Sequence, residues 1–165
     1  MESAEFGRLL NDLVEVTDIV DVDLTTDHGR WHLYEKAMVT SAGRDLVYLA
    51  VGLEPDEPLA SAAVVRAVET VADDQRPKWI SLLSEGNRGY ATRRAHELSL
   101  FERLAAGETN DVEVAGEADS WTDWLQSRIT QTSDSCGILA IMERRGRTER
   151  IRNQAKQRSI QLRCP

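Results

Sequence analysis

The chain has 165 residues, of which 41% are hydrophobic and 29% are charged, and its formal net charge is −8. This composition excludes an intrinsically disordered chain, and the length suffices for one domain with a hydrophobic core. No apolar run approaches the ~18 residues that a membrane-spanning helix requires, and the N-terminus lacks the pattern of a signal peptide. We therefore expect a single acidic, cytoplasmic domain over residues 1–165 that does not associate with membranes.

The first half of the sequence changes from a helical hydrophobic pattern to an extended one and back. Hydrophobic residues at helical spacing predict amphipathic helices over residues 4–14 and 59–73. Between these helices, alternating or continuous apolar runs rich in β-branched and aromatic residues predict three strands, over 16–24, 31–40 and 46–53. The short connection between the last two strands favours an antiparallel meander.

The second half alternates strand-like and helix-like segments. Short apolar runs predict strands over 78–83, 111–114, 136–142 and 160–164. Helical spacing predicts helices over 88–106, 121–130 and 144–158. Such alternation is typical of right-handed crossover connections. The sequence therefore predicts a three-layer α/β fold, with a mainly parallel sheet and the N-terminal antiparallel meander at one edge.

The two cysteines, Cys136 and Cys164, both fall within predicted strands. A cytosolic protein usually keeps such residues as reduced, buried thiols, so we expect no disulfide. The sequence does not show whether the two thiols lie close together.

Acidic residues recur in the loops that follow the predicted strands. In an open α/β sheet, ligands bind beyond the carboxyl ends of the parallel strands, so these acids would converge and could hold Mg²⁺. The candidate metal ligands are Glu54 and Glu85, the candidate catalytic residues are Glu85, Asp119 and Glu143, and Asp56 lies in the same set of loops. Arg88, at the start of a helix, is the candidate phosphate contact. The alternative is that these acids are solvated surface groups.

Two families of phosphoryl-transfer enzymes share parts of this pattern. The strand that ends in Glu85 and Gly86 resembles the Toprim fold, and the opening order of elements is similar to that of restriction-endonuclease-like nucleases. The sequence lacks the later aspartate pair of the first family and the Asp followed by Glu-x-Lys of the second. The resemblance therefore covers the order of elements and not the chemistry.

The C-terminal segment reverses the charge of the rest of the chain. From Glu143 onward it holds eight basic and two acidic residues. Its predicted helix has a thin apolar face of Ile151 and Ala155, so its basic side chains must reach solvent or a partner. Arginine suits bidentate contacts with phosphate or carboxylate groups. Alternatively, these arginines pair with acids of the protein itself or of a second subunit.

The leading interpretation is a binding or regulatory domain whose C-terminal arginine-rich helix contacts nucleic acid or an acidic protein partner. The predicted ligand-binding residues are Arg88, Arg144, Arg147, Arg150 and Arg152. This interpretation requires no cofactor and is compatible with a homo-oligomer. The alternative is a small metal-dependent nuclease or phosphoryl-transfer enzyme that uses Mg²⁺ and the loop carboxylates. The sequence identifies neither the partner nor the substrate.

Overall fold

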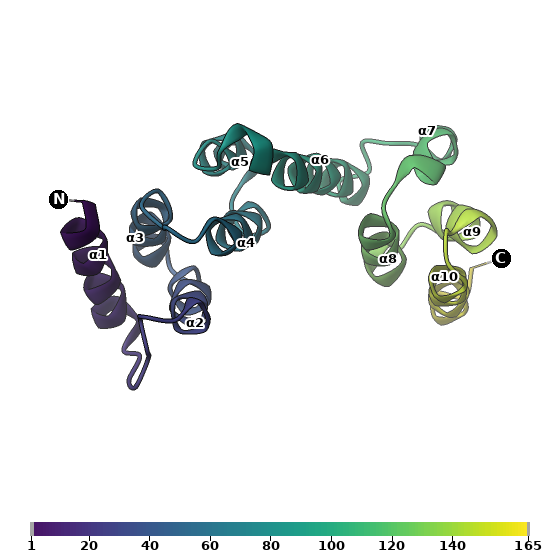
Figure 1. The fold of residues 1–165 in the computed structure, drawn as a ribbon. Coiled ribbons are helices and arrows are strands. Elements are labelled where there is room, and N and C mark those ends of the chain that lie inside the picture. The colour runs from purple at the N-terminus through teal and green to yellow at the C-terminus, as the bar shows by residue number, and fades with distance from the viewer. Residues whose placement is uncertain (1, 165) are drawn as a thin grey trace. The chain divides into compact units, whose positions relative to one another are not determined.

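The computed structural model describes residues 2–164, and every regular element within them is a helix (Figure 1). These residues form ten α-helices and three short 3-10 helices, with no strand. The α-helices are α1 (Glu2–Thr17), α2 (Asp27–Ala37), α3 (Ser41–Val51), α4 (Glu57–Val68), α5 (Arg76–Ile80), α6 (Arg88–Ala105), α7 (Asp111–Glu117), α8 (Asp123–Thr132), α9 (Cys136–Arg145) and α10 (Glu149–Gln161). The 3-10 helices are η1 (Asp73–Gln75), η2 (Glu85–Asn87) and η3 (Ala118–Ser120). The predicted α/β fold with its parallel sheet and N-terminal meander is therefore wrong.

The chain divides into two compact units, Met1–Ala95 and His96–Pro165, with the division inside α6. In the first unit α1 packs against α2 and α3, α2 against α3 and α4, and α3 against α4. In the second unit α7 packs against α9, α8 against α9 and α10, and α9 against α10. These helices thus pack mainly against the next helix and the next but one, a pattern typical of helical repeat proteins. The single domain stays a prediction, because a compact unit need not fold alone.

The sequence pattern located several helices correctly and misassigned others. The predicted helices over 4–14, 59–73, 88–106 and 121–130 coincide largely with α1, α4, α6 and α8, and the arginine-rich helix with the end of α9 and α10. The segments predicted as strands are helices, turns or irregular loops. The run 31–40 forms most of α2, residues 46–51 of the run 46–53 lie in α3, and 136–142 lies in α9.

Burial on several sides explains why α3 and α9 resemble strands in sequence. Helix α3 packs against α1, α2 and α4 and buries Val47, Ala50 and Val51. Helix α9 packs against α7, α8 and α10, and it buries both Leu139 and Met142 completely. A helix surrounded by other helices has a wide apolar arc, so its sequence shows a continuous apolar run. Periodicity alone does not distinguish such a run from a buried strand.

A nine-residue pattern occurs twice in the first unit, at an interval of fourteen residues. Residues 26–34 and 40–48 share the pattern Thr-x-x-Gly-Arg-x-x-Leu/Val-Tyr. In both copies the threonine hydroxyl caps the helix by accepting the glycine N–H at 3.0 Å. A Cβ atom on Gly29 or Gly43 would lie 1.9 or 2.1 Å from the carbonyl oxygen six residues earlier. Only glycine therefore allows the start of either helix to pass so close to the preceding chain.

Arginine recurs four residues after an N-cap and contacts the C-terminal end of the preceding helix. The C-terminal carbonyl groups of a helix have no partner within it, so a guanidinium that reaches them joins successive helices. Arg44, Arg76, Arg88 and Arg152 donate in this way to the carbonyl groups of Met38 (3.1 Å), Val68 (3.2 Å), Ser81 (3.1 Å) and Gly146 (2.6 Å), respectively. Two predicted ligand-binding residues, Arg88 and Arg152, thus bind backbone within the protein.

The second unit has its own hydrophobic core and a disulfide. Trp121, Leu125 and Ile129 pack in this core together with the buried face of α9. Cys136, the first residue of α9, is joined to Cys164, which follows α10, and their Cα atoms are 5.5 Å apart. The expectation of two reduced thiols is therefore wrong. The predicted strands around the two cysteines are absent. The packing of α10 on α9 brings Cys136 and Cys164 together.

Candidate binding site

Helix α10 forms because its first turn is capped and one narrow stripe of it is apolar. The Thr148 hydroxyl accepts the Ile151 N–H at 3.2 Å, and Glu149 in the first turn complements the helix dipole. Only Ile151 and Ala155 are buried within the helix, as the sequence predicts. The remaining side chains of α10 reach the surface or the neighbouring helices.

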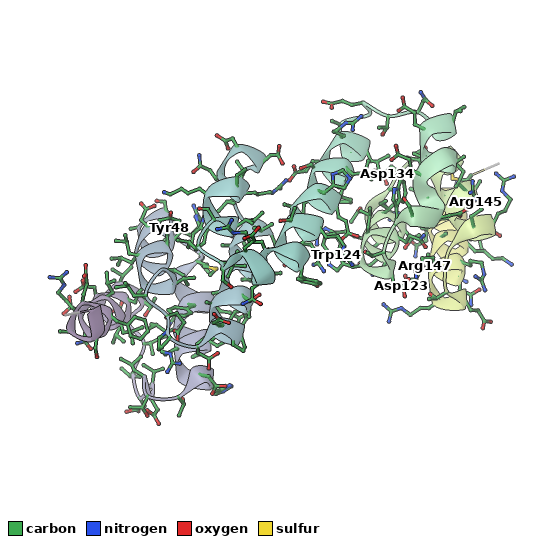
Figure 2. All side chains as sticks on the ribbon, turned by 45° about the horizontal axis from the view of Figure 1, so that its top comes forward. Tyr48, Asp123, Trp124, Asp134, Arg145 and Arg147 are labelled. Carbon is green, nitrogen blue, oxygen red and sulfur yellow. A yellow bond between two sulfur atoms is a disulfide. The ribbon has the colours of Figure 1, made fainter. Side chains whose placement is uncertain are left out.

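Arg145 and Arg147, which precede α10, are held by acids of the same unit. Figure 2 labels both arginines, with Asp123 beside Arg147. The Arg145 guanidinium donates to both carboxylate oxygens of Asp119, and this hydrogen bonding lowers the pKa of Asp119 and raises the pKa of Arg145. Arg147 lies 3.4 Å from Asp123 and donates to the Trp121 carbonyl at 3.2 Å. Internal pairing, which the sequence left open, therefore occupies these two arginines.

The other arginines of the segment differ in what they contact. Arg158 donates to Asp134 at 2.6 Å, and Arg144 donates to the Ala140 carbonyl of its own helix at 3.2 Å. Arg150 is exposed and makes no ion pair or hydrogen bond with the described part of the chain. Arg150 is therefore the member of the predicted site that is most available to a ligand.

A groove with a volume of about 570 Å³ runs between α8 and α10. Five of the nine lining residues carry side-chain amides, and Glu149, Arg150 and the ion-paired Arg158 add charged groups. The lining residues are Thr130, Gln131, Glu149, Arg150, Asn153, Gln154, Gln157, Arg158 and Gln161. Amides both donate and accept hydrogen bonds, so this groove suits a ligand that does both.

One groove residue has an unsatisfied acceptor. The Oε1 atom of Gln154 is buried and accepts no hydrogen bond from the described residues. An unsatisfied buried oxygen of this kind costs about 1–3 kcal/mol, so protein structures contain few of them. Gln154 also lines the groove, but this oxygen is buried, so a ligand in the groove does not reach it in this side-chain conformation.

The predicted metal ligand Glu54 serves another purpose. Its side chain is fully buried and accepts from the Arg30 Nε–H at 3.1 Å and from the Tyr34 hydroxyl at 2.7 Å. Asp56 caps α4 by accepting the Leu59 N–H. These two acids stabilise the first unit locally.

The remaining predicted acids do not form a site within either unit. Glu85 starts the exposed helix η2, Glu143 is exposed on α9, and Asp119 is bound to Arg145. Among residues 2–164 no group of three or more acids, histidines or cysteines could hold a metal ion. The convergence of these acids was expected from a parallel sheet, and that sheet is absent. The enzyme alternative stays a prediction that no contact in the structure favours.

Sequence reasoning missed the amides of the groove. Gln154, Gln157 and Gln161 lie three and four residues apart, the spacing of one helix face. This signal was visible, but it was divided between a helix and a predicted strand. The partner residues on α8 could not be identified without the packing of α8 on α10.

Comparisons with known proteins identify no relative of this chain. No family model matches the chain, and no curated protein or solved structure is significantly similar to it. Within residues 2–164 no helix combines the length and the hydropathy needed to cross a bilayer.

Proposed function

We propose that this chain is a helical binding domain that engages an acidic protein partner through α10 and the groove between α8 and α10. The observation that carries the proposal is Arg150, which is exposed on the groove and makes no ion pair among the described residues. An available guanidinium beside hydrogen-bonding amides can bind a carboxylate in bidentate geometry.

An acidic protein segment fits this surface better than nucleic acid does. Binding to a nucleic acid needs several available cations that neutralise successive phosphates. Three of the eight basic residues from Arg144 onward, namely Arg145, Arg147 and Arg158, instead pair with acids of the protein. The net charge of −8 repels a polyphosphate backbone more strongly than it repels a segment with a few carboxylates.

Binding of a labelled peptide tests this proposal. Fluorescence anisotropy would compare an alternating Ser-Glu decamer with a single-stranded oligonucleotide of ten residues at low and physiological salt. We expect the peptide to bind more tightly, and we expect Arg150→Glu to weaken its binding roughly tenfold. Tighter binding of the oligonucleotide, or no binding of the peptide, would exclude the proposal.

Arg144→Glu is the matched control for this test. It changes the net charge by the same amount, and Arg144 is also exposed, but Arg144 does not line the groove. The control variant should bind the peptide nearly as the unchanged protein does. Equal weakening by both substitutions would mean that only the general charge of the segment matters.

We also propose that the protein is located in the cytoplasm. A reducing cytosol keeps most thiols reduced, so the Cys136–Cys164 bridge would form there only under oxidising conditions. Alkylation of thiols in intact cells before lysis would test this. Full protection of both cysteines from alkylation would place the protein in an oxidising compartment instead.

A further inference from the structure

The Cys136–Cys164 bridge joins the start of α9 to the turn that ends α10. Cys136 is the first residue of α9, and Cys164 is the second residue after Leu162, the C-cap of α10. Both cysteines are half-buried rather than enclosed in the core. Exposed or strained bridges are reduced more readily than enclosed ones, and regulatory disulfides belong to this class.

The turn that ends α10 is a Schellman motif. The Arg163 N–H donates to the Ile160 carbonyl at 3.1 Å, and the Cys164 N–H donates to the Ser159 carbonyl at 3.0 Å. These bonds satisfy carbonyl groups that the end of a helix otherwise leaves without partners. Because Cys164 is itself a member of the motif, its bond to Cys136 holds the motif closed.

Arg163 is an unfavourable residue for this turn. Its φ angle is 55°, in the left-handed region, and glycine usually occupies this position of a Schellman motif. A residue with a Cβ atom is disfavoured in that region, roughly fivefold to thirtyfold relative to the right-handed one. The backbone of Arg163 therefore favours opening of the turn, and the bridge opposes this opening.

Contacts of α10 with its neighbours confine such an opening to the last turn. Arg158 donates to the Ser133 carbonyl at 3.3 Å and to Asp134 at 2.6 Å, and the buried residues of the helix all precede Arg158. In residues 161–164 the two hydrophobic side chains are half-buried against the core, and the other two are exposed. Gln161 also lines the groove between α8 and α10, so the last turn connects the bridge to one end of the groove.

We propose that the Cys136–Cys164 bridge is a redox switch that holds or releases the last turn of α10. In the oxidised form the bridge keeps residues 161–164 in the Schellman motif, and the groove between α8 and α10 is complete. In the reduced form Arg163 leaves the left-handed conformation, and the turn opens together with the groove residue Gln161. This inference goes beyond the proposed function and does not depend on which ligand the groove binds.

The covalent step uses a peroxide in one direction and a dithiol in the other. One thiolate of the pair attacks hydrogen peroxide and becomes a sulfenic acid with release of water, and the second thiol then forms the Sγ–Sγ bond and releases a second water. In the reverse direction a thiolate of the dithiol attacks one sulfur of the bridge, and the other sulfur leaves as a thiolate and takes a proton. The second thiol of the reductant then resolves the mixed disulfide, so that two electrons pass to the protein.

NMR spectroscopy of the isotopically labelled full chain tests the switch directly. Backbone chemical shifts would be recorded with the bridge intact and after reduction with dithiothreitol. We expect the signals of residues 161–164 to move to random-coil values on reduction, while those of Ile151 and Ala155 keep their helical values. Cys136→Ser, which cannot form the bridge, should show the open turn without any reductant. Unchanged signals of residues 161–164, or loss of helical shifts throughout α10, would overturn the proposal.

The variants Arg163→Gly and Arg163→Ala separate backbone conformation from charge. Both remove the guanidinium, but only glycine removes the Cβ atom that disfavours the left-handed region. The ratio of bridged to reduced protein would be measured in glutathione buffers of fixed composition. We expect Arg163→Gly to shift this ratio toward the bridge roughly fivefold, and Arg163→Ala to leave it within about twofold of the unchanged protein. Equal shifts with both variants, or no shift with either, would mean that the bridge is not coupled to the turn and would overturn the switch.

Discussion

Tyr34 donates its hydroxyl hydrogen to the Oε2 atom of Glu54 at 2.7 Å, with both side chains fully buried in the first unit. Arg30 donates to the same oxygen at 3.1 Å. Burial, reinforced by the hydrogen bond to Glu54, raises the pKa of Tyr34 above its ordinary value of 10.0. Folding therefore favours the neutral phenol, and this preference makes the stability of the fold depend on pH.

The first prediction concerns alkaline pH. The raised pKa of Tyr34 contributes stability that is fully present below pH 10 and is lost above it, because the unfolded chain releases the proton first. We expect the free energy of unfolding to fall by about 1.4 kcal/mol per pH unit above pH 10 through this residue. Urea unfolding of the unchanged protein and of Tyr34→Phe, measured from pH 8 to pH 11, checks this.

Tyr34→Phe should be less stable at pH 8 by about 1–2 kcal/mol, because it removes a hydrogen bond to a buried carboxylate. The difference between the two proteins should shrink as the pH rises above 10. Tyr48 and Tyr90 are present in both proteins, so their titration cancels. Parallel pH profiles would contradict the assignment.

The second prediction concerns the two close glycines. Gly29→Ala and Gly43→Ala each place a Cβ atom about 2 Å from a backbone oxygen, so each should destabilise the protein by ~2–3 kcal/mol. Gly7→Ala is the control, since Gly7 lies inside α1 with open space around it. This variant should gain ~0.5–1 kcal/mol. Thermal unfolding followed by circular dichroism would rank the three variants, and similar effects for all of them would exclude a close approach.

The third prediction concerns the arginine contacts between helices. Arg76 is 2% exposed, and its substitution by methionine leaves the Val68 carbonyl without its donor. We expect Arg76→Met to cost ~2–3 kcal/mol in urea unfolding. Arg8→Met, which removes an exposed pair at 3.9 Å with Glu5, should change stability by less than ~0.5 kcal/mol. Equal effects of the two substitutions would mean that the contact with Val68 does not stabilise the packing.

The fourth prediction concerns the disulfide of the second unit. Cys136 and Cys164 are separated by 28 positions, and closing a loop of this length in the unfolded chain is worth ~3–4 kcal/mol in the chain-entropy model. Reduction, or the double change Cys136→Ser and Cys164→Ser, should destabilise the second unit by that amount. Fluorescence of Trp121 and Trp124 during urea unfolding reports on this unit when Trp31 and Trp79 of the first unit are replaced by phenylalanine in all proteins compared. An unchanged midpoint under reducing conditions would show that the bridge is absent in solution.

The sequence predicted helices that show one face to a core. Leu9, Leu10 and Leu13 recur at helical spacing and are all buried in α1, and the narrow stripe of Ile151 and Ala155 was identified correctly. Helices covered on several sides, such as α9, lose this periodicity. Interpreting such apolar runs as strands that alternate with helices is a single kind of error. This error produced the whole predicted parallel sheet.

The candidate site was predictable in part. The arginine segment was identified, yet its pairing with acids depended on contacts such as Arg145 with Asp119, 26 residues apart. No pattern in a single sequence connects such positions, and the same holds for Cys136 and Cys164. The repeated pattern that begins at Thr26 and Thr40 was visible and would have indicated repeated helices.

The local packing of the helices also bears on how fast the protein folds. Within each unit, the main contacts of a helix involve partners at most two helices away along the chain. Such contacts require only short loops to close before favourable interactions form, so the entropic barrier is low. Helical proteins in which such local contacts dominate reach the folded state in microseconds to milliseconds.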